Sequence, residues 1–321
     1  MESKSYILIL LTLILTSCGG SHDGEIPLPD SVSGSGSSSG GGDVSSGSGT
    51  NSSTGSSSGV RSGESYLTSS GGKIIAFKSQ NISLASNEFL TGATTANGFV
   101  FYATYSSLTY PNEYWKIYKL TPSTGAVSLH CSWIENGNLW RGMASDDTYL
   151  YIYEGTYRQS IRKIQISNCG YQTSITSPLT MLYQSQPTFA VDAGWLYYPA
   201  RTNTSYSYPY TYGLIQVTTS NQNLSTAVNE IGLGSSSTNW GSTYAVAARQ
   251  GSKWGVFSPD YSHYSIWRFN SQVPANVATL PNKVMNIYLY PFSASFLDNN
   301  TLVLFLSSYD PKIIYFDVSG F

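Results

Sequence analysis

A pattern of about fifty residues recurs five times along the chain, and it limits the possible folds more than any other feature. Each copy has a pair of small or apolar residues, a turn with Asp, Asn or Gly, and a strand rich in aromatic residues. The copies read TTANGFVFYA, ASDDTYLYIY, AVDAGWLYYP, AARQGSKWGVFS and SFLDNNTLVLFL. Aligned on Val100, Leu150, Leu196, Gly255 and Val303, they are separated by 50, 46, 59 and 48 residues. Such a period indicates repeated units that bury their apolar faces against one another.

Further strands follow each copy of the pattern. A second apolar strand reads YWKIYKLTP, IRKIQISN, YGLIQVTT, SIWRFNS or KIIYFDVS, and a third short strand reads GAVSLHC, YQTSITS or NVATLPN. Four strands per repeat of this length are typical of a β-propeller blade. The segment KIYKLTPSTGAVSL resembles the propeller hairpin in which two strands flank a Thr-Gly turn. No strict WD40, NHL or YWTD consensus recurs, so the resemblance is to the propeller class and implies an all-β fold.

The two ends of the repeat region predict how the propeller closes. The last repeat lacks its outer strand, and the segment KIIAFKSQNISLAS stands alone before the first repeat. We predict that this N-terminal segment completes the last blade, because that pairing closes the ring and protects its edges. Five blades account for nearly the whole of 66–321 and are the preferred number. Six blades are the alternative, with a degenerate blade inside the 59-residue step.

The first residues predict export and lipid attachment. The apolar run between Tyr6 and Leu15 is shorter than the roughly 20 residues that span a bilayer, and it is typical of an export signal. The sequence Leu-Thr-Ser-Cys that ends at Cys18 resembles a bacterial lipobox. The resemblance implies a signal peptide over 1–17 and a lipid anchor on Cys18. Position 19 is glycine, whereas an aspartate at this position retains enterobacterial lipoproteins at the inner membrane. The glycine therefore favours the outer membrane of the cell envelope, on either its periplasmic or its surface side.

A Gly/Ser tract follows the lipidated cysteine. Residues 18–65 contain very few apolar side chains and are predicted to form a disordered tether, because they cannot bury enough surface to fold. A Gly/Ser chain of this length has a root-mean-square reach of about 40 Å. The folded β-propeller domain is predicted over 66–321.

Charge and motifs exclude several function classes. The net charge is −2 and only 11% of residues are charged, which argues against nucleic-acid binding. His22, His130 and His263 show no metal-ligand spacing, so neither a metal nor another cofactor is predicted. No nucleophile elbow or phosphate-binding loop occurs outside the tether. Four aspartates are predicted to lie in the inner turns and to accept hydrogen bonds there from backbone amides: Asp146, Asp147, Asp192 and Asp298.

Cys131 and Cys169 are the remaining cysteines, and an exported context permits them to form a disulfide. Cys131 is predicted at the end of an outer strand and Cys169 in an outer turn on the opposite face. A disulfide requires Cα atoms within about 7 Å. The sequence leaves the pairing open.

Tyrosine-rich loops are predicted on the face opposite the inner turns. The richest loop, TNTSYSYPYTYG, carries Tyr208 and Tyr210, and every equivalent loop contains a tyrosine. Aromatic platforms beside amide and hydroxyl groups bind sugars or proteins, although the same side chains can pack one blade against the next. The candidate ligand-binding residues are Trp140, Arg141, Gln186, Tyr208, Tyr210, Trp240 and Tyr290.

These features predict a membrane-anchored, non-enzymatic binding or scaffold module for an envelope protein or glycan. The alternative is a carbohydrate-active enzyme, which would need two carboxyl groups about 5 to 10 Å apart at the aromatic face. The carboxylates predicted on that face are Glu113, Glu135, Glu154, Asp260 and Asp310. A propeller acting only as a rigid spacer in an envelope assembly is the third hypothesis.

Overall fold

The computed structural model describes residues 62–68, 71–109, 112–135, 140–154, 160–176, 188–201, 211–218, 229–235, 243–257, 263–268, 275–306 and 310–321. All of them belong to one compact unit, residues 58–321. The predicted signal peptide and Cys18 lie outside the described residues. The described part contains strands and turns and no helix, hence no helix able to cross a membrane.

Five sheets of four or five strands account for almost all of the described residues. Sheet 1 contains β3 (Phe89–Ala96), β4 (Phe99–Thr109), β5 (Asn112–Leu120) and β6 (Val127–Glu135). Sheet 2 contains β7 (Trp140–Ser145), β8 (Tyr149–Glu154), β9 (Ser160–Gln165) and β10 (Tyr171–Thr176). Sheet 3 contains β11 (Ala190–Asp192), β12 (Trp195–Arg201), β13 (Thr211–Thr218) and β14 (Asn229–Ser235). Sheet 4 contains β15 (Thr243–Arg249), β16 (Ser252–Phe257), β17 (His263–Arg268) and β18 (Ala275–Pro281).

Sheet 5 joins the two ends of the repeat region. Its strands are β21 (Pro291–Asp298), β22 (Thr301–Leu306), β23 (Lys312–Asp317), β2 (Lys73–Asn81) and β1 (Glu64–Leu67). The N-terminal strand β2 pairs with β23, which confirms the predicted closure of the last blade. Strand β1 adds a fifth strand that the sequence did not predict. A small hairpin of β19 (Lys283–Val284) and β20 (Ile287–Tyr288) precedes β21.

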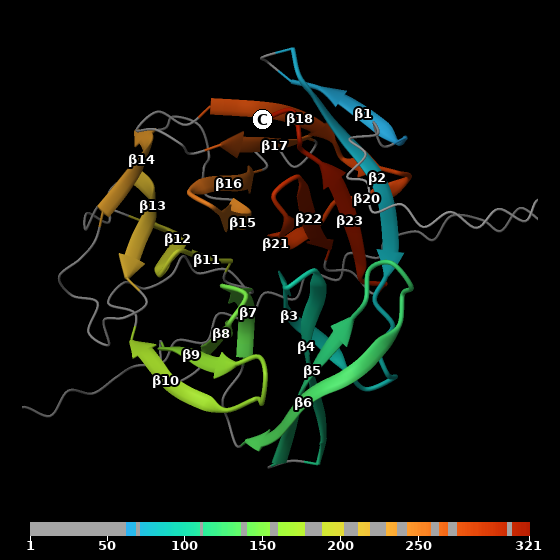
Figure 1. Ribbon diagram of the computed structural model, residues 1–321, viewed down its shortest axis with the longest axis vertical. Coiled ribbons are helices and arrows are strands. Elements are labelled where there is room, and N and C mark those ends of the chain that lie inside the picture. Colours follow the sequence, from blue (N-terminus) through green and yellow to red (C-terminus); the bar gives the residue numbers. More distant parts are fainter. Residues whose placement is uncertain are drawn as a thin grey trace, which may run out of the picture. The chain divides into compact units, whose positions relative to one another are not determined.

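The sheets are arranged as the blades of a β-propeller (Figure 1). The first strand of each repeat is the inner one, and the inner strands contact one another in the cycle β3, β7, β11, β15, β21 and back to β3. Strands β3 and β7 approach so closely that a Cβ on Gly92 would lie 2.9 Å from the carbonyl carbon of Gly142. The predicted propeller is therefore confirmed, and the described sheets are compatible with five blades.

The turns between first and second strands lie at one end of the inner strands. In three sheets this turn has two residues, both with positive φ: Asn97-Gly98, Ala193-Gly194 and Gln250-Gly251. Two such residues are characteristic of the type I′ turn, whose twist matches that of the flanking strands. We call the end with these turns the turn end, and the end where β3, β7, β15 and β21 begin the loop end.

Apolar and aromatic side chains fill the space between neighbouring sheets. One cluster contains Trp115, Phe101 and Met143 of sheets 1 and 2, and another contains Tyr151 and Tyr198 of sheets 2 and 3. These side chains are almost fully buried. For these side chains, packing of one blade against the next is the role that the structure shows.

Candidate functional site

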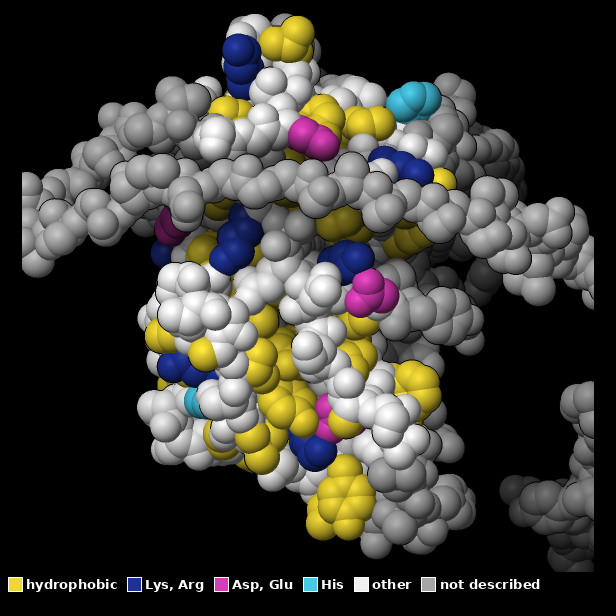
Figure 2. All heavy atoms as spheres, turned by 90° about the vertical axis from the view of Figure 1, so that its right-hand side faces the viewer, with side chains coloured by type: hydrophobic (Ala, Val, Ile, Leu, Met, Phe, Trp, Pro, Cys, Tyr) yellow, Lys and Arg dark blue, Asp and Glu magenta, His cyan; other side chains and the backbone are white. Residues whose placement is uncertain are grey.

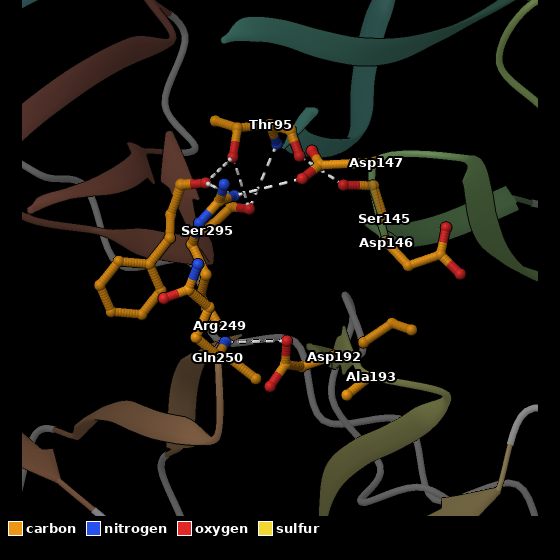
Figure 3. Close-up of a pocket in the computed structure, with 12 residues that line it drawn as sticks. Thr95, Ser145, Asp146, Asp147, Asp192, Ala193, Arg249, Gln250 and Ser295 are labelled. Carbon is orange, nitrogen blue, oxygen red and sulfur yellow. Dashed lines mark hydrogen bonds and ion pairs between the residues drawn. The ribbon is translucent and has the colours of Figure 1, made fainter. Parts of the chain in front are cut away.

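A polar pocket lies at the turn end, where the inner strands meet (Figure 3). Its volume is about 140 Å³, enough for several water molecules or a small polar ligand. The lining residues come from the inner strands of all five sheets and from the turns that follow these strands: Thr95, Ser145, Asp146, Asp147, Val191, Asp192, Ala193, Ala248, Arg249, Gln250, Ser295 and Phe296. Three carboxylates and a single arginine give this pocket its charge.

Two of the inner-turn aspartates bind within their own turn. Asp146 accepts hydrogen bonds from the backbone amides of Thr148 and Tyr149 at 3.1 and 2.8 Å, and one from the Tyr151 hydroxyl at 2.7 Å. Asp298 accepts one from the backbone amide of Asn300 at 2.8 Å and one from the Thr301 hydroxyl at 3.0 Å. This is the turn role expected from the sequence.

The other two aspartates bind the turn of a different sheet. Asp147 Oδ1 accepts a hydrogen bond from the backbone amide of Asn97 at 2.7 Å, across 50 residues of sequence. Asp192 accepts hydrogen bonds from the backbone amides of Gln250 and Gly251 at 2.9 and 2.7 Å. The sequence interpretation missed these contacts between sheets. Burial, together with the charge of Asp192, raises the pKa of the nearby Tyr197 to about 12.

Arg249 extends along one side of the pocket toward Asp147 (Figure 3). Its Nε donates a hydrogen bond to Asn299 Oδ1 at 2.9 Å, and its Nη1 lies 3.5 Å from Asp147 Oδ2. Arg249 thus links sheet 4 to sheets 5 and 2. Every carboxylate of the pocket has a hydrogen-bond or ion-pair partner, and the contacts of Asp147, Asp192 and Arg249 join neighbouring sheets.

The loop end of sheet 1 has a different character, because it carries a row of aromatic side chains. Phe89, Tyr105, Trp115 and Trp133 are directly paired across the four strands, so they lie on one face. The ring centroids of Phe89 and Tyr105 are 6.5 Å apart, and those of Tyr105 and Trp115 are 5.0 Å apart. Trp115 is fully buried, Tyr105 and Trp133 are half-buried, and Phe89 is 61% exposed. We call these four residues the aromatic row.

A buried carboxylate lies on the opposite face of sheet 1, because its partners Lys116 and Tyr118 alternate with Trp115 along β5. Glu88 accepts hydrogen bonds from the Lys116 ammonium at 2.6 Å and from the Tyr118 hydroxyl at 2.9 Å. Burial alone would raise the pKa of Glu88, but these hydrogen bonds and the charge of Lys116 outweigh it and lower the pKa. The same hydrogen bond raises the pKa of Lys116. Glu88 is therefore a charged anchor of the connection into β3.

Apolar side chains also reach the surface on the rim of sheet 1. Val127, Leu129 and Ile134 of the outer strand β6 are about half exposed. Figure 2, which views the side of sheets 1 and 5, shows hydrophobic side chains gathered there among scattered charged ones. Apolar surface on this molecule is thus not confined to the loop end.

The predicted ligand-binding residues are only partly described. Tyr290 precedes β21 at the loop end and is 57% exposed, with its ring centroid 6.5 Å from that of Tyr288. Trp140 and Arg141 are the first residues of β7, which also begins at the loop end, and their side chains lie outside the description. Gln186, Tyr208, Tyr210 and Trp240 lie outside the described residues, so their role stays a prediction.

The described carboxylates of the enzyme alternative have partners of their own. Glu154 is buried and accepts hydrogen bonds from Ser160 at 2.9 Å and from Arg162 Nε at 2.6 Å. Asp310 is paired with Lys312 at 2.8 Å. The side chains of Glu113 and Glu135, and the whole of Asp260, lie outside the description.

Cys131 and Cys169 form a disulfide between sheets 1 and 2, with their Cα atoms 6.0 Å apart. The sequence suggested that Cys131 ends its strand, and this was wrong. Cys131 is the fifth of nine residues in β6, because the strand continues to Glu135. That position brings it beside the turn of sheet 2 that contains Cys169. The neighbouring His130 has a lowered pKa, mainly because it is partly buried.

Comparisons with known proteins find only distant likenesses. No protein-family model and no curated protein matches the chain. Glutaminyl cyclase from Myxococcus xanthus is 11% identical with a TM-score of 0.48, over 76% of this chain and 97% of that one. The GH43_1 enzyme from Xanthomonas citri is 11% identical with a TM-score of 0.45, over 73% and 89%. Both TM-scores are below 0.5, so the β-propeller fold is assigned from this chain's own strand order.

Proposed function

We propose that this protein is a non-enzymatic binding module of the bacterial cell envelope, anchored to the membrane through lipid on Cys18. Its loop end binds an envelope protein or a glycan. The observation that carries the proposal is the aromatic row, which runs from the buried Trp115 to the largely exposed Phe89. A rigid aromatic surface of this kind loses little conformational entropy when a partner covers it.

The location of the row supports this assignment. It lies at the end of sheet 1 where β4 ends and β5 begins, the position at which the sequence places a tyrosine-rich loop in every repeat. Tyr290 adds an exposed ring at the same end of sheet 5. Aromatic rings stack on sugar faces and are also enriched in the centres of protein interfaces. The long Gly/Ser tether lets this end search for a partner away from the lipid surface.

The bonding of the carboxylates supports a non-enzymatic role. A glycosidase needs one carboxylic acid that gives a proton and a second carboxylate that acts as base or nucleophile. At the turn end the aspartates are bound to turn amides. At the loop end Glu88 is bound to Lys116 and Tyr118. These groups hold the fold together.

A glycan array and a pull-down from envelope extract, both with the full chain, test the proposal. The wild type should bind a partner, and the triple variant Tyr208→Ala, Tyr210→Ala, Trp240→Ala should bind it at least about tenfold more weakly. Tyr171→Ala is the matched control, because this tyrosine is 58% exposed at the turn end of sheet 2. Equal losses in the triple variant and the control would count against the loop end. Hydrolysis of a bound glycan would instead support the enzyme alternative.

A further inference from the structure

One cluster of metal-binding side chains lies outside both the polar pocket and the aromatic row. His130, Cys131 and Cys169 each offer one ligand atom, and these atoms lie within 4.8 Å of one another. Ligand atoms bound to one metal ion lie at comparable separations, because metal–sulfur and metal–nitrogen bonds are about 2.0–2.3 Å long. In the oxidised protein the two sulfur atoms are joined to each other.

An irregularity in β6 explains how His130 and Cys131, two successive residues of one strand, both reach the turn that contains Cys169. The pairing of β5 with β6 passes from Ile117 opposite Cys131 to Tyr118 opposite Leu129, so His130 is an extra residue. Successive side chains of a regular strand point to opposite faces. An extra residue bends the strand and redirects a side chain, which lets His130 lie beside Cys131.

A hydrogen bond orients the imidazole of His130. Its Nε2 lies 2.9 Å from the carbonyl oxygen of Ile166. A carbonyl oxygen only accepts, so in the neutral ring Nε2 carries the proton and Nδ1 keeps a free lone pair. Metal-binding histidines commonly donate their second N–H to a backbone carbonyl in this way. In this tautomer Nδ1 is the nitrogen that is available to a metal ion.

The three side chains are held in place by contacts other than the disulfide. The turn of Cys169 is closed by a hydrogen bond from its own amide to Gln165 at 2.9 Å. The bond from His130 to Ile166 joins β6 to the same turn. Cys131 and Cys169 belong to the apolar cluster between sheets 1 and 2, and the His130 ring packs edge-on against Phe101 of that cluster. Because these contacts do not depend on the disulfide, we expect its reduction to leave the three ligands next to one another.

We propose that the reduced protein binds one zinc-class divalent metal ion through His130, Cys131 and Cys169. A dithiol reductant supplies two electrons and two protons to the disulfide, becomes a disulfide itself, and leaves two thiols. The metal ion then displaces the two thiol protons and binds two thiolate sulfurs and one imidazole nitrogen. Two cysteines and a histidine suit Zn²⁺, with a fourth position for water. The metal would link sheets 1 and 2 in place of the disulfide.

Titration with Co²⁺, a spectroscopic substitute for Zn²⁺, tests the proposal. The full chain carries Cys18→Ser, which leaves Cys131 and Cys169 as its only cysteines. Reduced protein should show thiolate-to-cobalt absorption that saturates at one ion per chain, whereas oxidised protein should show none. Cys131→Ser or Cys169→Ser should abolish this absorption, and His130→Gln should weaken binding by about tenfold or more. His263→Gln, which changes an exposed histidine of β17, should bind normally.

Two results of the titration would overturn the proposal. One is a reduced protein that gives no saturable absorption. The other is a His130→Gln variant that binds Co²⁺ as tightly as the unchanged chain. Circular dichroism melting accompanies each titration. If reduction unfolds the protein and Co²⁺ fails to restore its melting transition, the proposal is also wrong.

Discussion

The two ends of the propeller use their side chains differently. At the turn end, charged and polar residues are bound to one another and to backbone amides, and Arg249 joins Asn299 and Asp147 beside the pocket that they form. At the loop end of sheet 1, aromatic residues pass from a buried interior to an exposed edge, and Phe89 remains largely uncovered.

This difference shows where a propeller of this kind has surface left to bind a partner. Carboxylates gathered around a central pocket suggest chemistry at first sight, yet here their hydrogen bonds stabilise the turns. Aromatic side chains suggest packing at first sight, yet part of the aromatic row is uncovered. Whether a side chain is already hydrogen-bonded or buried therefore says more about its function than its residue type does.

The largest effect is expected from Trp115→Ala. This side chain is fully buried between sheets 1 and 2, and its removal should lower the free energy of unfolding by about 3–5 kcal/mol. Urea unfolding measures the loss. A loss below about 1 kcal/mol would show that the interior of the row is not a packing element, and the contrast between the two ends would weaken.

The next effect is expected from Glu88→Gln, which should cost about 1–2 kcal/mol at pH 7 because the ion pair with Lys116 is lost. The folded-state pKa of Glu88 is lowered, so its contribution is present above the ordinary glutamate pKa of about 4.3 and is lost as the pH falls through the lowered folded value. Urea unfolding of both proteins between pH 7 and pH 3 measures this. The difference between them should shrink toward acidic pH, and a difference independent of pH would contradict the assignment.

At the turn end, Asp192→Ala should lower the free energy of unfolding by about 1 kcal/mol, because two backbone amides of the next sheet lose their acceptor. Asp192→Asn keeps one oxygen acceptor and should lose less. Partner binding at the loop end should be unchanged in both variants. Asp310→Ala, at an exposed ion pair, is the control and should change stability little. Thermal or urea unfolding that ranks Asp310→Ala above Asp192→Ala would contradict the role of Asp192 as a link between sheets.

The smallest change in stability is expected from Phe89→Ala. Since this ring is mostly exposed, unfolding should shift by no more than about 0.5 kcal/mol. Binding of the partner found in the pull-down should nevertheless weaken. Comparison with Trp115→Ala in the same urea experiment separates the two parts of the row. A Phe89→Ala variant that unfolds easily yet binds the partner normally would contradict the proposed binding role of Phe89.

Much of the fold could be predicted because its signals are local. Gly after Asn97, Ala193 and Gln250 marks a two-residue turn, and the alternating apolar residues on either side mark its strands. The alignment of repeats was less accurate where the turn signal is weak. Val100, Leu150 and Leu196 are the second residues of β4, β8 and β12, whereas Gly255 and Val303 are the fourth and third residues of β16 and β22. Strand β1 is short and gave no clear pattern.

The candidate sites could be predicted only in part, because they depend on distant contacts. Asp146 and Asp298 bind amides two or three residues away, which their turn sequences indicate. Asp147 and Asp192 bind turns 50 and 58 residues away, and no local pattern identifies such partners. The aromatic row was missed for the same reason, since its four members come from four separate strands.

The sequence by itself determined the repeat, the all-β class and the closure by β2, since turn geometry and the two-residue period of strands are properties of neighbouring residues. Only the tertiary structure decided which side chains meet: the aromatic row, the links from Asp147 and Asp192, and the cluster of His130 with the two cysteines. These contacts depend on strand register, and a bulge of a single residue, such as the one at His130, redirects side chains between the two faces of a sheet.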